Sequence, residues 1–270
     1  MLRPFHWDET VAQLSRFHQL RNGQVVRLGM TEQANAVQIE IEAAQPLTPT
    51  ETAEIRQAVR RMLRLDEDLS EFHAFYGQFD GWQLKLEPGG GRLLRCATLF
   101  EDIVYTLCTT NINWSGTIRM VDRLVTALGR PLPGDSDGLA FPSPADIAAT
   151  TPEFLKQETG LGYRSPYVWE LATAVAEDRL DLTGFEDPDK PTQQVLAELN
   201  HLKGVGPYAA ATILMILGRY EHLAIDSEMR SFVSNKYFGG ERVTNGQIQN
   251  IYAPWGRWQY LAYWFDMPPE

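Results

Sequence analysis

The sequence is poor in the residues that most often bind metals. Its 270 residues include only two cysteines, Cys96 and Cys108, and five scattered histidines. Two thiols cannot supply a four-cysteine zinc site or an iron–sulfur cluster, and the histidines show no metal-ligand spacing. We therefore expect no metal site and no cofactor, so that any chemistry depends on ordinary side chains.

Long hydrophobic runs are also absent. Residues 1–20 contain acids, arginines and histidines where a signal peptide needs an apolar stretch, and no window approaches the roughly 18 apolar residues of a membrane span. We expect a cytoplasmic protein without a membrane partner, associated with the nucleoid if it is bacterial. In that compartment both thiols stay reduced.

Positive charge is scarce over the chain as a whole. There are 24 Lys and Arg against 35 Asp and Glu, a formal net charge of −11. A polyanionic partner would have to meet a local basic face. Residues 200–237 contain three acids and four basic residues, which are Lys203, Arg219, Arg230 and Lys236. Most of the acids lie in other parts of the chain. That stretch need not be negative, although its few cations predict few phosphate contacts and a modest affinity.

The residues that are present, 44% hydrophobic and 22% charged, indicate a globular protein with an ample core. Residues 24–30 and 36–41 run β-branched or alternate, with Glu32, Gln33 and Asn35 between them, and predict a hairpin. Residues 50–65 and 66–79 have helical patterns. The stretch 88–91 (PGGG) is the clearest break, so we place a domain boundary after residue 94.

Strand patterns almost disappear beyond residue 95, and helical patterns separated by short Gly, Pro and Asp clusters take their place. The predicted helices are 98–110, 113–128, 144–149, 167–177, 192–199, 208–219, 227–237 and 247–264. The expected fold is mainly α, with a small α+β N-terminal domain (1–94) followed by a helical domain (95–270).

Residues 202–210 (LKGVGPYAA) are the most informative stretch. A tight turn of Gly204, Val205 and Gly206 that opens a helix leaves backbone N–H groups without helical partners, where a phosphate oxygen can bind them. Glycine permits the close approach that a Cβ would block. An ordinary helix–helix turn is the alternative, because glycines are common in such turns.

Eighteen residues after Tyr208, Asp226 stands directly before an apolar-periodic helix. At that N-cap position a carboxylate accepts backbone N–H bonds, and the positive end of the helix dipole favours its charge. An isolated aspartate before a helix is most often only a cap. Its combination with the glycine turn weakens that alternative.

The pattern L-x-G-V-G-x-x-A, followed by an aspartate that opens a later helix, resembles the helix-hairpin-helix (HhH-GPD) DNA glycosylase superfamily. Residues 91–111, 141–144 and 160–164 are similar to segments of the 8-oxoguanine DNA glycosylases, and residues 254–262 to the C-terminal helix of 3-methyladenine DNA glycosylase II. The resemblance covers roughly residues 60–265, and five ordered segments together are specific where each alone is weak. It implies a double-stranded DNA partner, base flipping and catalysis by Asp226.

Tyr208 departs from the bifunctional members of the superfamily, which carry a nucleophilic lysine at that position. Lys203 lies on the other side of the turn, where a phosphate contact is more natural, so we expect no lyase step. In the alkylation-repair members the position of Tyr208 holds a tryptophan that stacks on the flipped base. Tyr208, Trp264 and Trp114 are therefore the candidate pocket residues, with core packing as the alternative for each.

The resemblance also implies further DNA contacts. Thr110 and Asn111 match the loop that fills the space vacated by the flipped base, although Asn111 is equally plausible as a helix-end residue. Arg164 matches an arginine that contacts the orphaned partner base, and a surface salt bridge is its alternative. Together with Lys203, Gly204, Val205 and Gly206 these residues form the expected DNA-binding set.

The preferred function is a monofunctional glycosylase that excises an N-alkylated purine, acting as a monomer. Three alternatives stay open: excision of 8-oxoguanine or another oxidised base, excision of modified bases in defence against foreign DNA, and DNA binding without catalysis. The acidic balance of the chain disfavours the last, since a pure binder would profit from more cations. A monovalent cation at the hairpin is also left open.

Overall fold

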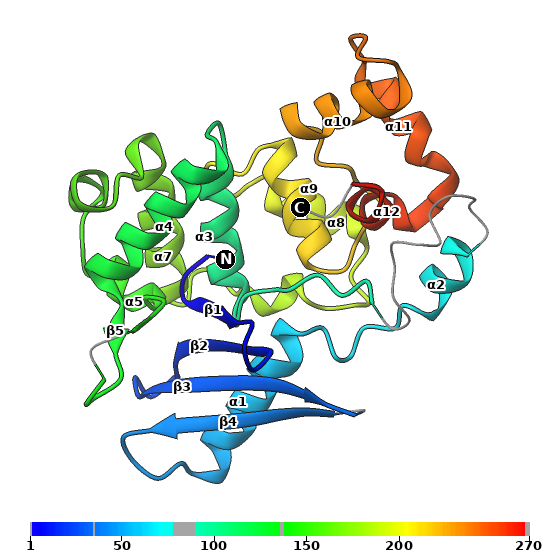
Figure 1. Ribbon diagram of the computed structural model, residues 1–270. Helices are drawn as coiled ribbons and strands as arrows, with labels where there is room; N and C mark the ends of the chain where they lie inside the picture. Colours follow the sequence, from blue (N-terminus) through cyan, green and yellow to red (C-terminus); the bar gives the residue numbers. More distant parts are fainter. Residues whose placement is uncertain (1, 35, 78–89, 136–137, 268–270) are drawn as a thin grey trace. The chain divides into compact units, whose positions relative to one another are not determined.

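The computed structural model describes residues 2–34, 36–77, 90–135 and 138–267 (Figure 1). Its contacts divide the chain into two compact units, each made of two separate stretches. Unit 1 comprises Met1–Met62 and Cys96–Thr183, and unit 2 comprises Leu63–Arg95 and Gly184–Glu270. The domain boundary after residue 94 stays a prediction; Pro88 and Gly89 of the expected break lie outside the described residues.

Unit 1 contains a four-stranded antiparallel sheet whose strands lie in sequence order. They are β1 (Phe5–Asp8), β2 (Gln13–Gln19), β3 (Val25–Gln33) and β4 (Ala36–Ala43). The predicted hairpin is confirmed, since Leu28 of β3 pairs with Ile41 of β4. Glu32 and Gln33 continue β3, so the connection is shorter than expected, and Asn35 lies outside the described residues.

Neither β1 nor β2 is indicated by the sequence pattern. The reason in β2 is its buried polar side chains, because Ser15, Arg16 and His18 are all less than a tenth exposed. A strand that buries polar residues lacks the apolar–polar alternation by which strands are recognised.

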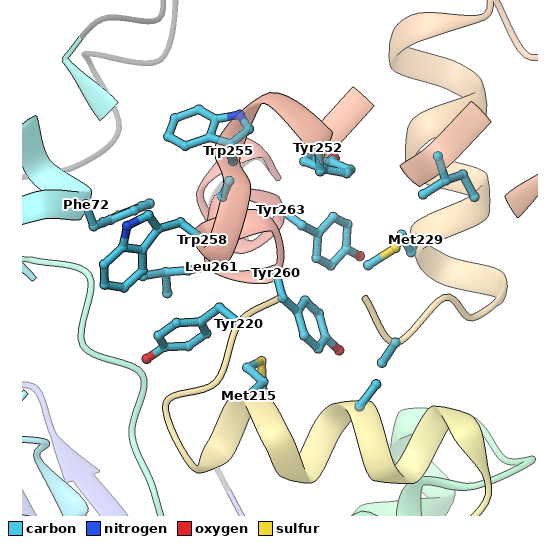
Figure 2. Packing of buried hydrophobic residues seen from close by; sticks show 14 of the residues in the cluster. Phe72, Met215, Tyr220, Met229, Tyr252, Trp255, Trp258, Tyr260, Leu261 and Tyr263 are labelled. Carbon is cyan, nitrogen blue, oxygen red and sulfur yellow. The ribbon is translucent and has the colours of Figure 1, made fainter. Parts of the chain in front are cut away.

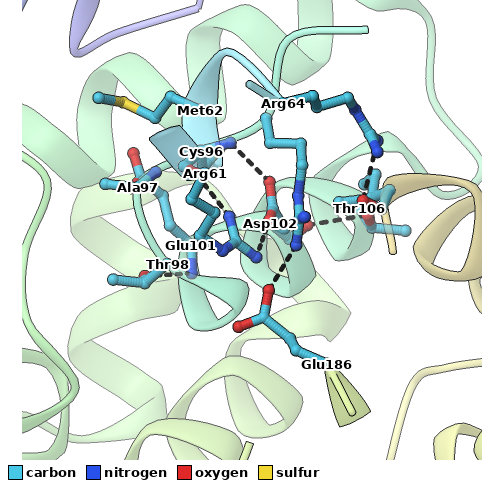
Figure 3. A network of polar contacts seen from close by, with 12 residues as sticks. Arg61, Met62, Arg64, Cys96, Ala97, Thr98, Glu101, Asp102, Thr106 and Glu186 are labelled. Carbon is cyan, nitrogen blue, oxygen red and sulfur yellow. Dashed lines mark hydrogen bonds and ion pairs between the residues drawn. The ribbon is translucent and has the colours of Figure 1, made fainter. Parts of the chain in front are cut away.

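Helix α1 (Pro49–Met62) buries Ile55, Val59 and Met62, as its periodicity predicts. Helix α3 (Leu99–Thr109) is buried along nearly its whole length and includes two buried acids. The carboxylate of Glu101 pairs with Arg16 at 3.2 Å. The carboxylate of Asp102 pairs with Arg61 at 2.8 Å (Figure 3). A buried carboxylate needs such a partner, so these pairs link the sheet and α1 to α3.

The helical part of unit 1 follows the predicted ranges closely, apart from short unpredicted pieces. Its remaining elements are α4 (Trp114–Leu128), β5 (Arg130–Pro131), β6 (Leu139–Ala140), α5 (Pro144–Ala148), α6 (Pro152–Phe154), a π-helical turn (Leu155–Thr159), a 3₁₀ turn (Gly162–Arg164) and α7 (Ser165–Ala176).

Unit 2 consists of helices. They are α2 (Ser70–Tyr76), α8 (Thr192–Leu199), α9 (Pro207–Ile216), α10 (Ser227–Tyr237), α11 (Asn245–Tyr252), a 3₁₀ segment (Ala253–Trp258) and α12 (Gln259–Asp266). The 3₁₀ turn Thr183–Phe185 lies where unit 1 ends and unit 2 begins. The helix expected over 66–79 is shorter in the described residues, which end at 77 there.

The single helix predicted over 247–264 is wrong. It is broken into α11, the 3₁₀ segment and α12, because Pro254 lacks an N–H group and Gly256 has φ +54°. With α6 added, the described residues after 95 form ten α-helices where eight were expected.

The core of unit 2 is mainly aromatic (Figure 2). Phe72, Tyr220, Tyr252, Trp255 and Trp258 are all buried, and the rings of Tyr220 and Trp258 stack with centroids 5.7 Å apart. Of the three tryptophans that the structure describes in this unit, Trp255 and Trp258 are thus core residues. Among the described residues, no helix combines the length and the apolar character needed to cross a membrane.

Candidate active site

The glycine turn between α8 and α9 forms the predicted helix-hairpin-helix element. The N–H of Val205 donates to the carbonyl of Leu202 at 3.0 Å, and Gly204 has φ +84°, a left-handed conformation that favours glycine. Val205 is buried and anchors the turn, while Lys203, Gly204 and Gly206 are exposed. The first N–H groups of α9 therefore begin at an exposed turn, where they have no helical acceptors.

Gly206 is required neither by the backbone nor by packing within the protein. Its φ of −91° and ψ of −176° are accessible to any residue, and an added Cβ would meet no atom of the described residues within 4 Å. This geometry is consistent with the explanation expected from the sequence. Glycine at position 206 lets a phosphate oxygen approach the helix N-terminus closely.

Asp226 caps α10 as the sequence predicts. Its Oδ1 accepts a hydrogen bond from the N–H of Met229 at 2.8 Å, and the side chain is half-buried. Within the described part of the chain its Oδ2 receives no hydrogen bond. One oxygen of this carboxylate is thus fixed, and the other is available to a reacting group.

Aromatic side chains of α9 and α12 lie near Asp226. Tyr208 is half-buried on the first turn of α9. In α12 the rings of Tyr260 and Trp264 stack with centroids 6.4 Å apart, and the indole N–H of Trp264 donates to the sulfur of Met215 at 2.8 Å. In Figure 2 the ring of Tyr263 lies beside Met229, three residues after Asp226.

The charge of Asp226 acts on both α12 tyrosines. Burial is the main cause that raises the pKa of Tyr263, and the negative charge of Asp226 raises it further. Burial also raises the pKa of Tyr260, with smaller contributions from Tyr208 and Asp226. Both hydroxyls therefore stay protonated at neutral pH, so Asp226 is held beside neutral aromatic rings.

Tyr260 and Tyr263 are site residues that the sequence analysis missed. A signal was present, because residues 260, 263 and 264 have the i, i+3, i+4 spacing that places side chains on one helix face. This spacing alone does not separate a site face of the helix from a core face, because both are lined by aromatic residues. Trp264, which was predicted, is 40% exposed and lies on that face.

The remaining predicted residues belong to unit 1. Thr110 follows α3, and its hydroxyl donates to the carbonyl of Leu107 at 2.8 Å. Asn111 is exposed with φ +50°, and Trp114 begins α4 with 59% exposure. Arg164, by contrast, is only 5% exposed. The pocket role of Trp114 and the DNA contacts of the other three stay predictions.

Among the described residues, no group of three or more His, Cys, Asp or Glu side chains is arranged to hold a metal ion. The two cysteines, both in unit 1, are buried and unbridged. Burial raises the pKa of the Cys108 thiol to about 12. Neither thiol has the low pKa and exposure of a reactive cysteine.

Comparison with known proteins places this geometry in a fold class. No family model matches the chain. A curated relative, the N-glycosylase/DNA lyase of Saccharomyces cerevisiae, is 26% identical over 174 residues, which are 60% of this chain and 46% of the relative. The chain thus matches a little less than half the length of that relative.

Solved structures match over nearly the whole chain. The 3-methyladenine DNA glycosylase of Archaeoglobus fulgidus has a TM-score of 0.77 at 20% identity, over 97% of this chain and 88% of that one. The Clostridium acetobutylicum 8-oxoguanine glycosylase/lyase, in complex with double-stranded DNA, has a TM-score of 0.65 at 18% identity, over 92% and 87%.

The chain therefore has the fold of these solved DNA glycosylase structures, as the sequence resemblance led us to expect. Within that fold class it is similar both to a 3-methyladenine glycosylase and to 8-oxoguanine glycosylases. The expected fold class, a small sheet-containing N-terminal part followed by a mainly helical chain, is confirmed.

Proposed function

We propose that this protein is a DNA glycosylase that flips a damaged or modified base out of the duplex and hydrolyses its N-glycosidic bond. The observation that carries the proposal is Asp226, held at the N-terminus of α10 with one oxygen available and with Tyr260 and Tyr263 within reach of its charge. The shared fold and the similarity to the yeast N-glycosylase/DNA lyase support it.

The chemistry follows from the charge of Asp226. When the bond between C1′ and the base nitrogen breaks, its electron pair leaves with the base and the sugar becomes positive. A carboxylate below the sugar stabilises this oxocarbenium-like transition state. The same carboxylate orients or deprotonates the water whose oxygen then bonds to C1′.

We propose that the enzyme leaves the DNA strand intact. A lyase needs an amine that attacks C1′ and forms a Schiff base, and position 208 holds tyrosine where bifunctional members hold lysine. Lys203 is exposed on the hairpin, on the other side of the turn. The yeast relative is named an N-glycosylase/DNA lyase, so the proposed absence of a lyase step distinguishes this protein from that relative.

An N-alkylated purine is the proposed substrate. Such a base carries a positive charge, so it leaves without a strong acid and is attracted to the faces of aromatic rings. The aromatic set of Tyr208, Tyr260 and Trp264 supports this choice, as does the similarity to a 3-methyladenine glycosylase. We keep 8-oxoguanine as the second candidate, because two of the similar structures are 8-oxoguanine glycosylase/lyases.

The test is incubation of the purified protein with duplexes that each carry one lesion, followed by hot alkali, which cleaves the strand wherever a base was lost. We expect 3-methyladenine and 7-methylguanine to be released faster than 8-oxoguanine opposite cytosine. The reverse order would establish the second candidate, and binding without any release would reduce the protein to a DNA-binding module.

The same reactions examine the lyase step. Strands should stay unbroken until alkali is added, and borohydride should trap no covalent complex. A trapped complex would show that an amine, with Lys203 as the first suspect, attacks the sugar.

A further inference from the structure

Among the residues expected to contact DNA, Arg164 and Val205 are the least exposed, each at 5%. Arg164 ends the 3₁₀ turn Gly162–Arg164 in unit 1. Its Nε donates to the carbonyl of Leu107 at 3.0 Å and to the hydroxyl of Thr110 at 3.2 Å. One terminal nitrogen donates to the carbonyl of Thr110, and the other donates to that of Leu161 at 3.5 Å. The guanidinium thus joins the end of α3 to the loop that follows.

Tyr163 extends this connection to Asn111. The guanidinium of Arg164 lies over the Tyr163 ring, 4.4 Å from its centroid. The Tyr163 hydroxyl accepts a hydrogen bond from Nδ2 of Asn111 at 3.1 Å and lies 3.2 Å from the hydroxyl of Thr110. Both Tyr163 and Asn111 are exposed, so a buried arginine supports two side chains that face solvent.

The far side of the loop is fixed as well. Asn113 caps α4 by accepting the N–H of Gly116 at 2.9 Å. An added Cβ at Gly116 would lie 2.4 Å from the side chain of Ile112, so this glycine leaves the space that Ile112 fills. Asn111, between these two anchors, has φ +50°, which asparagine tolerates better than most residues. The loop is therefore held in one shape from both ends.

A guanidinium in this environment is poorly placed to bind a nucleobase. To turn outward, Arg164 would leave the carbonyls of Leu107 and Thr110 without these hydrogen bonds, and one of these bonds is buried. The Leu107 carbonyl would keep its bond from the Thr110 hydroxyl, but the buried guanidinium would lose several charge-assisted hydrogen bonds at once, which is unfavourable. A loop already fixed in its inserted shape, in contrast, binds better because little freedom is lost on binding.

We propose that Arg164 is a positioning residue that, together with Tyr163, holds the Thr110–Asn111 loop ready to enter the duplex, and that it does not recognise the base opposite the lesion. The proposal rests on the proposed glycosylase function. It predicts that tight binding to a damaged site depends on Arg164 equally for all four opposite bases.

Binding is measured by fluorescence anisotropy with duplexes that contain a tetrahydrofuran abasic analogue opposite A, C, G or T, and with an undamaged duplex. We expect the wild-type protein to bind the four analogue duplexes within about threefold of one another. Arg164→Gln should lose about tenfold in affinity for all four and little for the undamaged duplex. Arg179→Gln, at an exposed arginine of the same unit, is the matched control and should change neither.

Two further variants separate positioning from charge and from folding. Arg164→Lys keeps the charge but not the fork of donors, so it should bind like Arg164→Gln if the hydrogen bonds matter. Tyr163→Phe keeps the ring under Arg164 and removes only the hydroxyl contacts. Its loss of affinity should therefore be smaller than that of Arg164→Gln and equal for the four analogue duplexes. A 2-aminopurine beside the analogue reports loop insertion, and its fluorescence rise at saturating protein should shrink in all three variants.

A wild-type preference for one opposite base that disappears in Arg164→Gln would overturn the proposal and leave the glycosylase function intact. Lysine rescue of binding would overturn it too, in favour of a simple phosphate contact. If the wild-type protein bound no duplex, the proposed function itself would fail, and this inference with it.

Discussion

In the proposed mechanism the chemistry depends on Asp226, which has two separable roles. As the N-cap of α10 it accepts the N–H of Met229, and as a charge it opposes the developing oxocarbenium ion. Asparagine is an equally good N-cap but carries no charge. Asp226→Asn should therefore fold and bind DNA normally, yet lose at least about a hundredfold in single-turnover base release.

Glu228 provides the matched control for this prediction. It is an exposed carboxylate in the first turn of the same helix, and its charge also acts on Tyr263. Glu228→Gln should release the base at close to the wild-type rate if the position of the carboxylate, rather than the net charge of the helix, determines that rate. Release by Asp226→Asn within tenfold of wild type would remove Asp226 from the mechanism.

Tyr208 decides substrate choice in the proposed function. An aromatic ring against a positively charged base contributes roughly 1–2 kcal/mol when desolvated. Tyr208→Ala should slow release of 3-methyladenine about tenfold, a loss consistent with that energy, while Tyr208→Trp should preserve it. Steady-state release of the base from a methylated duplex measures the rates of both variants. Equal rates for Tyr208→Ala and Tyr208→Trp would show that the Tyr208 ring serves only in packing.

Individual site residues were predictable to different degrees. Asp226 and the glycine turn have local patterns, a cap before a helix and glycines before another, and both lie where expected. Tyr260, Tyr263 and Tyr163 have none, because in a chain with ten tyrosines only tertiary contacts separate a site residue from a core residue. The buried state of Arg164 depends on the loop of another helix and has no sequence signal.

Among the elements, the hairpin between α8 and α9 yields the sharpest prediction. Serine at position 206 would fit the backbone and is a favoured N-cap, so Gly206→Ser should change the free energy of unfolding by less than about 1 kcal/mol. Its side chain would nevertheless occupy the space through which a phosphate oxygen approaches. Affinity for any duplex, measured by anisotropy, should fall at least about tenfold, since the phosphate contact is independent of sequence.

Gly246 allows a control for that substitution. It is an exposed glycine in the first turn of α11, with no positive φ and only the Thr244 hydroxyl, at 4.0 Å, near an added Cβ. Gly246→Ser should leave duplex affinity unchanged. Unchanged affinity in Gly206→Ser as well would mean that the turn only connects two helices.

Helices were easier to predict than strands for a physical reason. The ranges of α8 and α10 match the prediction residue for residue, because an apolar face recurs over two or more turns. Strand β2 buries Arg16 and His18 against partners elsewhere in unit 1, so its side chains follow no alternation. Pro254 and Gly256 divide the last predicted helix, and both residue types are local sequence signals for such a break.

At the scale of the whole molecule, the linear sequence does not reveal which distant stretches pack together. Met1–Met62 forms a compact unit with Cys96–Thr183, and Leu63–Arg95 with Gly184–Glu270. The Arg16–Glu101 and Arg61–Asp102 pairs illustrate the cause, since each joins residues 41 or more positions apart. Composition and local periodicity carry no information about such partners.

Acid stability of the molecule should depend on one of these buried polar residues. His18 in β2 is 6% exposed, and its burial, followed by the charge of Arg16, lowers its pKa from 6.5 to about 3. The unfolded chain therefore binds a proton below pH 6.5 that the folded chain does not. The stability contributed by neutral His18 is complete above pH 6.5 and is lost as the pH falls towards 3.

The loss amounts to about 1.4 kcal/mol per pH unit, or about 2 kcal/mol between pH 7 and pH 5. Urea unfolding at these two values measures it, and His18→Gln, which cannot titrate, should remove that difference. His6→Gln, at an exposed histidine of the neighbouring strand β1, should retain it. An identical pH dependence in His18→Gln and wild type would show that His18 is protonated in the folded protein, and that the acid sensitivity of unit 1 arises from its buried carboxylates instead.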